Sequence, residues 1–543
     1  MALARRIPES VIDREPTKWG PDFDTYFETF DKSLDKAFDN YLASRETTSI
    51  AYDGLIPLAV LETMLTVGDN MHKVQYQHGN KSLPVLMDTV RRYTELNNSG
   101  IFDYYYGYLC MRHIMRTVCI GTLIESETFE DFLNSLSSDE ETVEVTEALA
   151  EEAFGILSDY LFENDISAIA VGIGLQSPNW DRAFTCVGGL DFDDARFLIS
   201  ILWKNRSQLI TLIEHGMLPG FPAFLFTLSE MTLLSKIPQS TKPWGQLQEI
   251  ILRAFLVGTR EERKTMRQLA LYAHHRILEQ NIVLDSTTDE EDARTVVRAY
   301  VDMFNPFWNY DKSLAPIMLL DIANILFRFV DSLLTSELAD CIPDVAKSAL
   351  ERIWLEIDRE NDGFMPAPRR GFTRKYAADI FHFLPDMRNR LLTNVGDDQA
   401  FSNMLLEVDI LGLAGRVLLM VSREGSNPDE WQNFRDDLVY LCDAMTGTGQ
   451  VPDELAYPNV ANWVKVRNQL DMLTVGTAPS RVLKRHLLEA GKSWEMFGPP
   501  HQEVPWEPRQ IQITFVESVL GRSIVVQGAN KCIGDCALLI RMH

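Results

Sequence analysis

The most suggestive chemical pattern in the sequence is a run of oxygen-bearing residues that follows a predicted helix. Asp358, Glu360 and Asp362 occupy positions one, three and five of a calcium-loop spacing, and Gly363 occupies position six. Such a loop needs a bidentate glutamate at position twelve, where this chain has Arg369. Because a guanidinium group at that position would repel the cation, the spacing predicts a polar turn rather than a calcium site.

Two cysteines in the C-terminal tail could supply thiolates to a zinc ion. They are Cys532 and Cys536, and His543 at the end of the chain could act as a third ligand. A structural zinc site needs four ligands in a tetrahedral arrangement, and nothing nearby in the sequence completes the set. The spacing therefore predicts two ordinary cysteines.

Clustered aspartates raise the alternative of an all-α enzyme that binds magnesium diphosphate, as terpene cyclases do. The nearest approaches are Asp191, Asp193 and Asp194, and the pair Asp436 and Asp437. Neither cluster has a further carboxylate one helical turn on, and Asp193 and Asp194 fit better as the cap of a helix that begins near Ala195. The sequence also lacks a complete phosphate loop of the Gly-x-x-x-x-Gly-Lys-Ser/Thr type and a Gly-x-Ser-x-Gly elbow. We therefore assign no catalytic, cofactor-binding or metal-ligating residue, and no cofactor.

The elements that would position any site are helices. Apolar residues recur every three or four positions from Asp22 to Ser44, and the segment from Phe102 to Ile124 is apolar nearly all round. Thr259 and Glu262 have the spacing of a capping box, which marks the start of a helix. Further helices are expected over 196–215, 245–256, 260–284, 289–304, 313–334, 344–359, 376–392, 398–422, 429–445, 457–473 and 479–497.

Helices of similar length joined by short connections favour antiparallel neighbours. The sequence therefore predicts an all-α fold, an elongated α-solenoid-like stack of helix hairpins of the armadillo or HEAT kind. A closed helical toroid is the alternative. We expect an N-terminal tail over 1–20, a first part of the array over 21–360 and a second part over 372–498. Residues 499–543 are expected to form a proline-containing spacer and a poorly ordered tail, in which 511–515 and 523–526 have an extended pattern.

Composition and charge limit the function further. The chain has 543 residues, of which 46% are hydrophobic, so it can form a large folded core. Its net charge of −27 at pH 7 argues against nucleic acid and anionic membranes as partners, and permits a basic protein partner. The segment from Glu125 to Asp181 contains no Lys or Arg. A solvated helix face explains this segment most simply, and a contact surface for a basic partner is the functional alternative.

The location expected from the sequence is the cytoplasm or the nucleus. The first residues lack the apolar stretch of a secretory signal, and no run is long and apolar enough to span a bilayer. The cysteines are sparse, odd in number and mostly embedded in apolar helical patterns, which is typical of free thiols in a reducing compartment. They are Cys110, Cys119, Cys186, Cys341, Cys442, Cys532 and Cys536.

Three segments of the first half resemble a group of large fungal all-helical proteins of unknown role. They are 106–112 (Tyr-Gly-Tyr-Leu-Cys-Met-Arg), 197–206 (from Phe197 to Arg206) and 218–226 (from Leu218 to Phe226). Some members of that group carry a MYND-type zinc finger after the helical body. Here only two cysteines remain in the tail, so the finger is absent, and the resemblance implies a helical body without known site residues.

These observations favour a non-catalytic protein-interaction scaffold. The alternatives are an all-α enzyme with a cavity site that one sequence does not reveal, and a regulatory protein with a lost or truncated zinc module. The oligomeric state is left open by the sequence.

Overall fold

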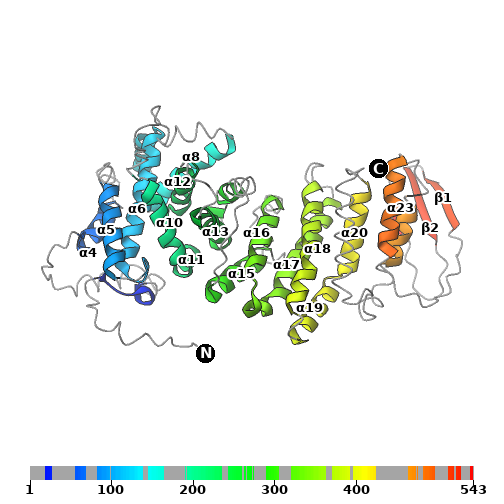
Figure 1. Ribbon diagram of the computed structural model, residues 1–543. Coiled ribbons are helices and arrows are strands. Elements are labelled where there is room, and N and C mark those ends of the chain that lie inside the picture. The colour runs from blue at the N-terminus through cyan, green and yellow to red at the C-terminus, as the bar shows by residue number, and fades with distance from the viewer. Residues whose placement is uncertain are drawn as a thin grey trace.

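The computed structural model describes the parts of the chain that form the helical body and a small C-terminal sheet (Figure 1). The described residues are 19–26, 55–68, 82–97, 100–138, 145–163, 190, 192–234, 242–259, 262–263, 266–271, 273, 289–304, 320–361, 370–391, 395–423, 463–472, 474, 481–495, 512–518, 521–527 and 538–541; within some of these elements single side chains are left out of the description.

Nine helices form what we call the N-terminal group. They are α4 (Leu58–Gly68), α5 (Ser82–Asn97), α6 (Tyr105–Glu125), α7 (Phe129–Ser138), α8 (Val145–Glu163), α10 (Phe192–Lys204), α11 (Arg206–Glu214), α12 (Phe221–Leu234) and α13 (Lys242–Val257). Helix α6 lies at the centre and packs against α4, α5, α8 and α12. This position explains its sequence, because a helix covered on all sides must be apolar all round.

Two polar residues of α6 bind main-chain oxygens of α4. His113 Nε2 lies 2.8 Å from the Leu61 carbonyl oxygen, and Arg116 donates to the Leu65 carbonyl oxygen at 3.1 Å. Both side chains are buried. Since an unpaired buried polar group is costly, these contacts explain how a nearly apolar helix accommodates an imidazole and a guanidinium.

A close backbone contact fixes the start of α6. A Cβ atom at Gly107 would lie 1.8 Å from the carbonyl oxygen of Ile101. Glycine is therefore required here by the close approach of the preceding loop. The Tyr108 hydroxyl also donates to the Met217 carbonyl oxygen at 3.0 Å, which links the same helix to the segment before α12.

The helices that follow form the central group. They are α15 (Glu290–Phe304), α16 (Leu320–Leu333), the 3₁₀ helix η5 (Ser336–Cys341), α17 (Ile342–Asn361), α18 (Arg370–Leu391), α19 (Val395–Glu407) and α20 (Ile410–Arg423). Helix α17 packs against α15, α18, α19 and α20 and is the core of this group. The domain boundary expected between 360 and 372 falls between α17 and α18, which pack closely together, and it stays a prediction.

A C-terminal pair consists of the helix over 463–472 and α23 (Arg481–Glu495). Two tryptophans join them reciprocally, because Trp463 and Trp494 each donate the indole N–H to the other's carbonyl oxygen at 2.9 Å. Helix α20 approaches this pair at Gly415, where a Cβ atom would lie 2.5 Å from Val466 Cγ2. The pair is therefore continuous with the central group.

A three-stranded antiparallel sheet lies in the tail, in the order β1 (Gln512–Ser518), β2 (Gly521–Gln527) and β3 (Leu538–Arg541). Its register pairs Phe515 with Ile524 and Ile524 with Ile540. Strands β1 and β2 coincide with the extended patterns of the sequence, so this part of the expected poorly ordered tail has a regular secondary structure.

The all-α prediction is confirmed for the body of the protein, and the described β structure consists of the small sheet and one isolated bridge between Asp22 and Tyr104. Figure 1 shows the helices side by side in an elongated row from α4 and α5 at one end to α23 at the other. This arrangement is compatible with solenoid-like stacking. None of the described helices is long and apolar enough to cross a bilayer.

Two predicted helices are interrupted. The helix expected over 196–215 breaks at Asn205, whose side-chain amide donates to the Ile201 carbonyl oxygen at 2.6 Å and so competes with the helical ladder. The helix expected over 398–422 breaks at Asp409, which adopts a positive φ of 51°. Asp409 Oδ1 then accepts a hydrogen bond from the Gly412 amide at 3.0 Å and caps α20.

Candidate functional site

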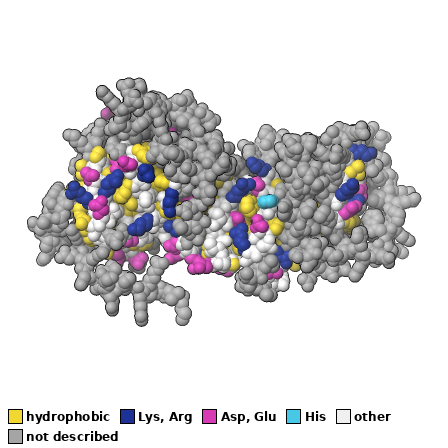
Figure 2. Space-filling view, viewed as in Figure 1, with side chains coloured by type: hydrophobic (Ala, Val, Ile, Leu, Met, Phe, Trp, Pro, Cys, Tyr) yellow, Lys and Arg dark blue, Asp and Glu magenta, His cyan; other side chains and the backbone are white. Residues whose placement is uncertain are grey.

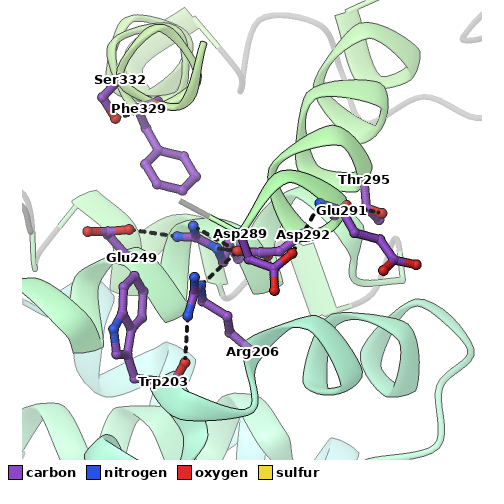
Figure 3. A network of polar contacts seen from close by, with 10 residues as sticks. Trp203, Arg206, Glu249, Asp289, Glu291, Asp292, Thr295, Phe329 and Ser332 are labelled. Carbon is purple, nitrogen blue, oxygen red and sulfur yellow. Dashed lines mark hydrogen bonds and ion pairs between the residues drawn. The ribbon is translucent and has the colours of Figure 1, made fainter. Parts of the chain in front are cut away.

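The most concentrated polar chemistry in the described structure is a buried network of two arginines and two carboxylates (Figure 3). Arg253 of α13 donates to Glu249 Oε2, one helical turn earlier, at 2.8 Å, and to Asp292 Oδ2 of α15 at 3.2 Å. Arg206 of α11 donates to the same Asp292 oxygen at 2.8 Å. One carboxylate therefore joins the guanidinium groups of two helices.

Aromatic rings cover the two guanidinium groups. The ring of Trp203 lies 4.6 Å from the guanidinium carbon of Arg206 and 5.1 Å from that of Arg253. Phe329 of α16 lies 5.1 Å from the guanidinium carbon of Arg253. Figure 3 shows Phe329 and Trp203 on opposite sides of the network. Since a ring face attracts a cation most strongly where water is excluded, these contacts add to the ion pairs.

Local sequence places each member of the network. Asp292 is in the first turn of α15, where Asp289 Oδ1 accepts a hydrogen bond from the Glu291 amide at 3.1 Å and negative charge is favoured by the helix dipole. Arg206 is the first residue of α11, directly after the break at Asn205. Without that break, the helix would direct position 206 differently, so the interruption helps to aim the arginine.

Burial of the network is nearly complete. Side-chain exposure is 0% for Asp292, 2% for Arg253, 3% for Glu249 and 13% for Arg206. The charges balance, with two positive and two negative groups. Burial raises the pKa of the Glu249 carboxyl, which the charge of Asp292 also raises and the Arg253 guanidinium opposes. Isolated buried charges would be far more costly, so the pairing accounts for their presence.

The arrangement suits packing better than catalysis. Both carboxylates accept hydrogen bonds from guanidinium groups, and both side chains are buried, so neither faces a substrate in solvent. Among the residues that the structure describes, no three His, Cys, Asp or Glu side chains are grouped so as to hold a metal ion.

A second buried polar cluster lies in the central group. Arg352 and Glu356 of α17 pair at 2.7 Å with side chains 1% and 0% exposed. Nearby, the hydroxyl groups of Tyr300 on α15 and Tyr376 on α18 lie 3.3 Å apart. Burial raises the pKa of both tyrosines, so their hydroxyls stay protonated at physiological pH. The tyrosine pair joins two helices, whereas Arg352 and Glu356 pair within α17.

The patterns that the sequence analysis considered are dispersed. Asp358 lies within α17, and the calcium-like spacing from 362 to 369 falls outside the described residues, as do Cys532, Cys536, His543, Asp191, Asp436 and Asp437. Asp193 and Asp194 belong to the first turn of α10, which begins at Phe192 rather than near Ala195. Asp194 pairs with Arg91 of α5 at 2.7 Å and so joins two helices.

On the surface, the described parts of α7 and α8 are acidic. Glu130, Asp131, Glu147, Glu151 and Glu152 are exposed, and the sequence around them contains no Lys or Arg. On the face drawn in Figure 2, by contrast, basic and acidic side chains are interspersed with hydrophobic ones over the N-terminal group. Charge of one sign therefore gathers on these two helices.

The sequence did not reveal the buried network. Its only local signal is the i, i+4 spacing of Glu249 and Arg253, which occurs commonly on exposed helices. Asp292 and Arg206 are 86 residues apart, and nothing in their surroundings links them. The chain matches no known protein-family model, and it shows no significant similarity to any curated protein.

Proposed function

We propose that this protein is a non-catalytic interaction scaffold whose helical surface binds another protein. The observation that supports the proposal is the use of the buried ionisable groups. In the described body, Arg253, Asp292 and Glu249 pair across or along helices, as Arg352 and Glu356 do. The buried ionisable groups therefore hold helices in place, and the charged groups that could bind a partner are those on the surface.

A basic protein is the partner that the charge favours. The net charge of −27 attracts cationic surfaces over a range set by the Debye length, about 8 Å at physiological salt. The exposed carboxylates of α7 and α8 provide an acidic surface in the described part of the molecule, in a stretch of sequence without Lys or Arg. A solenoid-like row of helices offers such a surface over a long span.

The cytoplasm or the nucleus is the proposed location. Cys110 and Cys119 are free and buried in the apolar core of α6. Burial raises the pKa of the Cys119 thiol to about 12, which keeps it protonated and inert. Such thiols suit a reducing compartment.

Affinity capture from the native cell at low salt tests the proposal, followed by measurement of the binding of the captured protein in purified form. We expect a reproducible protein partner whose affinity falls as salt is raised. Glu151→Lys with Glu152→Lys should weaken binding at least tenfold, whereas Glu95→Lys with Glu214→Lys, exposed acidic positions on α5 and α11, serves as the charge-matched control. Repeated failure to recover any partner would refute the scaffold.

A further inference from the structure

The N-terminal and central groups meet through a small set of helices. Among the described elements, the main packing between the groups joins α11 and α13 on one side to α15 and α16 on the other. Figure 1 shows this junction near the middle of the row, with α13 beside α15 and α16. The relative orientation of the two groups therefore depends on few contacts.

The buried charge network lies at this junction. Arg206 and Arg253 belong to the N-terminal group, and Asp292 belongs to the central group. Phe329 of the central group lies over Arg253, and Trp203 of the N-terminal group lies over both arginines. The strongest polar contacts in the junction thus run from one group to the other.

Ion pairs of this kind select one orientation. A slide or rotation of α15 against α13 by a few ångströms would part Asp292 from both guanidinium groups, which are now 2.8 Å and 3.2 Å away. It would part Asp292 and Arg206 from each other and leave Arg253 with Glu249 alone, in a site that excludes water. Purely apolar contacts would tolerate the same movement more easily, because dispersion and burial are not directional. Intermediate orientations are therefore penalised.

We propose that the Arg206–Arg253–Asp292 network is an ionic lock that fixes the orientation of the central group relative to the N-terminal group. When the lock is broken, the two groups keep their own folds and move as separate bodies. The reason is that the cores of the groups lie elsewhere, around α6 in one and around α17 in the other. The proposal concerns the shape of the molecule and stands whether or not the protein binds a partner.

Asp292→Asn in the full-length protein is the direct test, because asparagine keeps the size of the side chain and removes its charge. We expect unchanged helix content by circular dichroism, a broader distribution of interatomic distances in X-ray scattering, and at least tenfold faster amide exchange at the facing ends of α13 and α15. Amide exchange in α6 and α17 should stay as in the wild type, because those helices are internal to the two groups.

The matched control is Asp340→Asn. Asp340 pairs with Arg294 of α15 at 2.7 Å, but this pair is exposed and links α15 to η5 within the central group. The Asp340→Asn variant should change neither the X-ray scattering profile nor the amide exchange at the junction. If Asp292→Asn does not fold, Arg206→Gln gives the second test, since Arg206 is at the edge of the network. A folded variant of either kind with wild-type scattering and wild-type exchange in α13 and α15 overturns the proposal, and so does collapse of both variants, because the groups would then not be independent.

Discussion

The paired hydroxyls of Tyr300 and Tyr376 allow a quantitative test of how the central group is held together. The two oxygens lie 3.3 Å apart between α15 and α18, and the side chains are 0% and 1% exposed. Replacing one tyrosine by phenylalanine leaves the other hydroxyl buried without this partner. An unsatisfied buried polar group costs about 1–3 kcal/mol, so each single variant should be destabilised by that amount.

The double variant Tyr300→Phe/Tyr376→Phe should be less destabilised than the sum of the two single variants. Both polar groups are then gone, and replacing two partners by apolar groups of the same shape is nearly neutral. We expect a coupling of about 1–2 kcal/mol between the two positions. Hydrogen exchange of α15 and α18 measures it as a local opening free energy, in which tenfold in rate corresponds to about 1.4 kcal/mol.

Tyr26→Phe provides the control for this cycle. Tyr26 donates its hydroxyl to the Phe102 carbonyl oxygen at 2.7 Å in the N-terminal group, far along the chain from the tyrosine pair. The loss of unfolding free energy caused by Tyr26→Phe should add to that caused by Tyr300→Phe within about 0.5 kcal/mol. Strict additivity of Tyr300→Phe and Tyr376→Phe would refute the reasoning, because it would mean that neither hydroxyl depends on the other.

Three further outcomes can be measured directly. Gly155→Ala, in an open part of α8, should stabilise the protein by about 0.5–1 kcal/mol in denaturant unfolding, whereas Gly107→Ala should destabilise it by about 3 kcal/mol because its Cβ meets a carbonyl oxygen. Peptide mapping after brief alkylation of the native protein should find Cys341 modified before Cys119, which is fully buried. The raised pKa of Glu249 favours the folded state at low pH, and this contribution is lost as pH rises above the ordinary carboxyl value. The Glu249→Gln variant should therefore lose less stability than the wild type between pH 4 and pH 7. Equal slopes of unfolding free energy against pH in the two proteins would contradict the raised pKa of Glu249.

Helices were predictable where local signals agree. The capping box is present as expected, since the Thr259 amide donates to Glu262 Oε2 at 2.9 Å and the Glu262 amide lies 3.4 Å from Thr259 Oγ1. The expected helix over 344–359 corresponds to α17, because its apolar rhythm is unbroken. The breaks at Asn205 and Asp409 were not predictable in the same way, since both residues also occur inside helices and no glycine or proline marks the positions.

The contacts between side chains far apart in the sequence could not be predicted from the sequence for a different reason. Arg253 and Asp292 are 39 residues apart, and Tyr300 and Tyr376 are 76 residues apart, so their meeting depends on the packing of whole helices. Periodicity tells which face of a helix is buried, but it does not tell which helix covers that face. The candidate site could therefore be found only with the helices in place.

The charged network lies at a contact where the apolar stripes of the helices alone do not decide how the helices align. Amphipathic helices with similar apolar stripes can pack against one another in several alignments of nearly equal apolar burial, which leaves a stack of such helices poorly specified. A buried arginine removes most of these alternatives, because an alignment that does not bring a carboxylate to it leaves a charge unpaired inside the protein. Glu249 on the same helix accompanies Arg253 in any alignment, but the second carboxylate, which Arg253 shares with Arg206, comes from α15. If this argument holds, replacing Arg253, Glu249, Arg206 and Asp292 together by apolar residues of similar size should leave the protein folded but broaden the distribution of shapes measured by X-ray scattering. A quadruple variant with the wild-type profile would show that the apolar contacts alone fix the alignment.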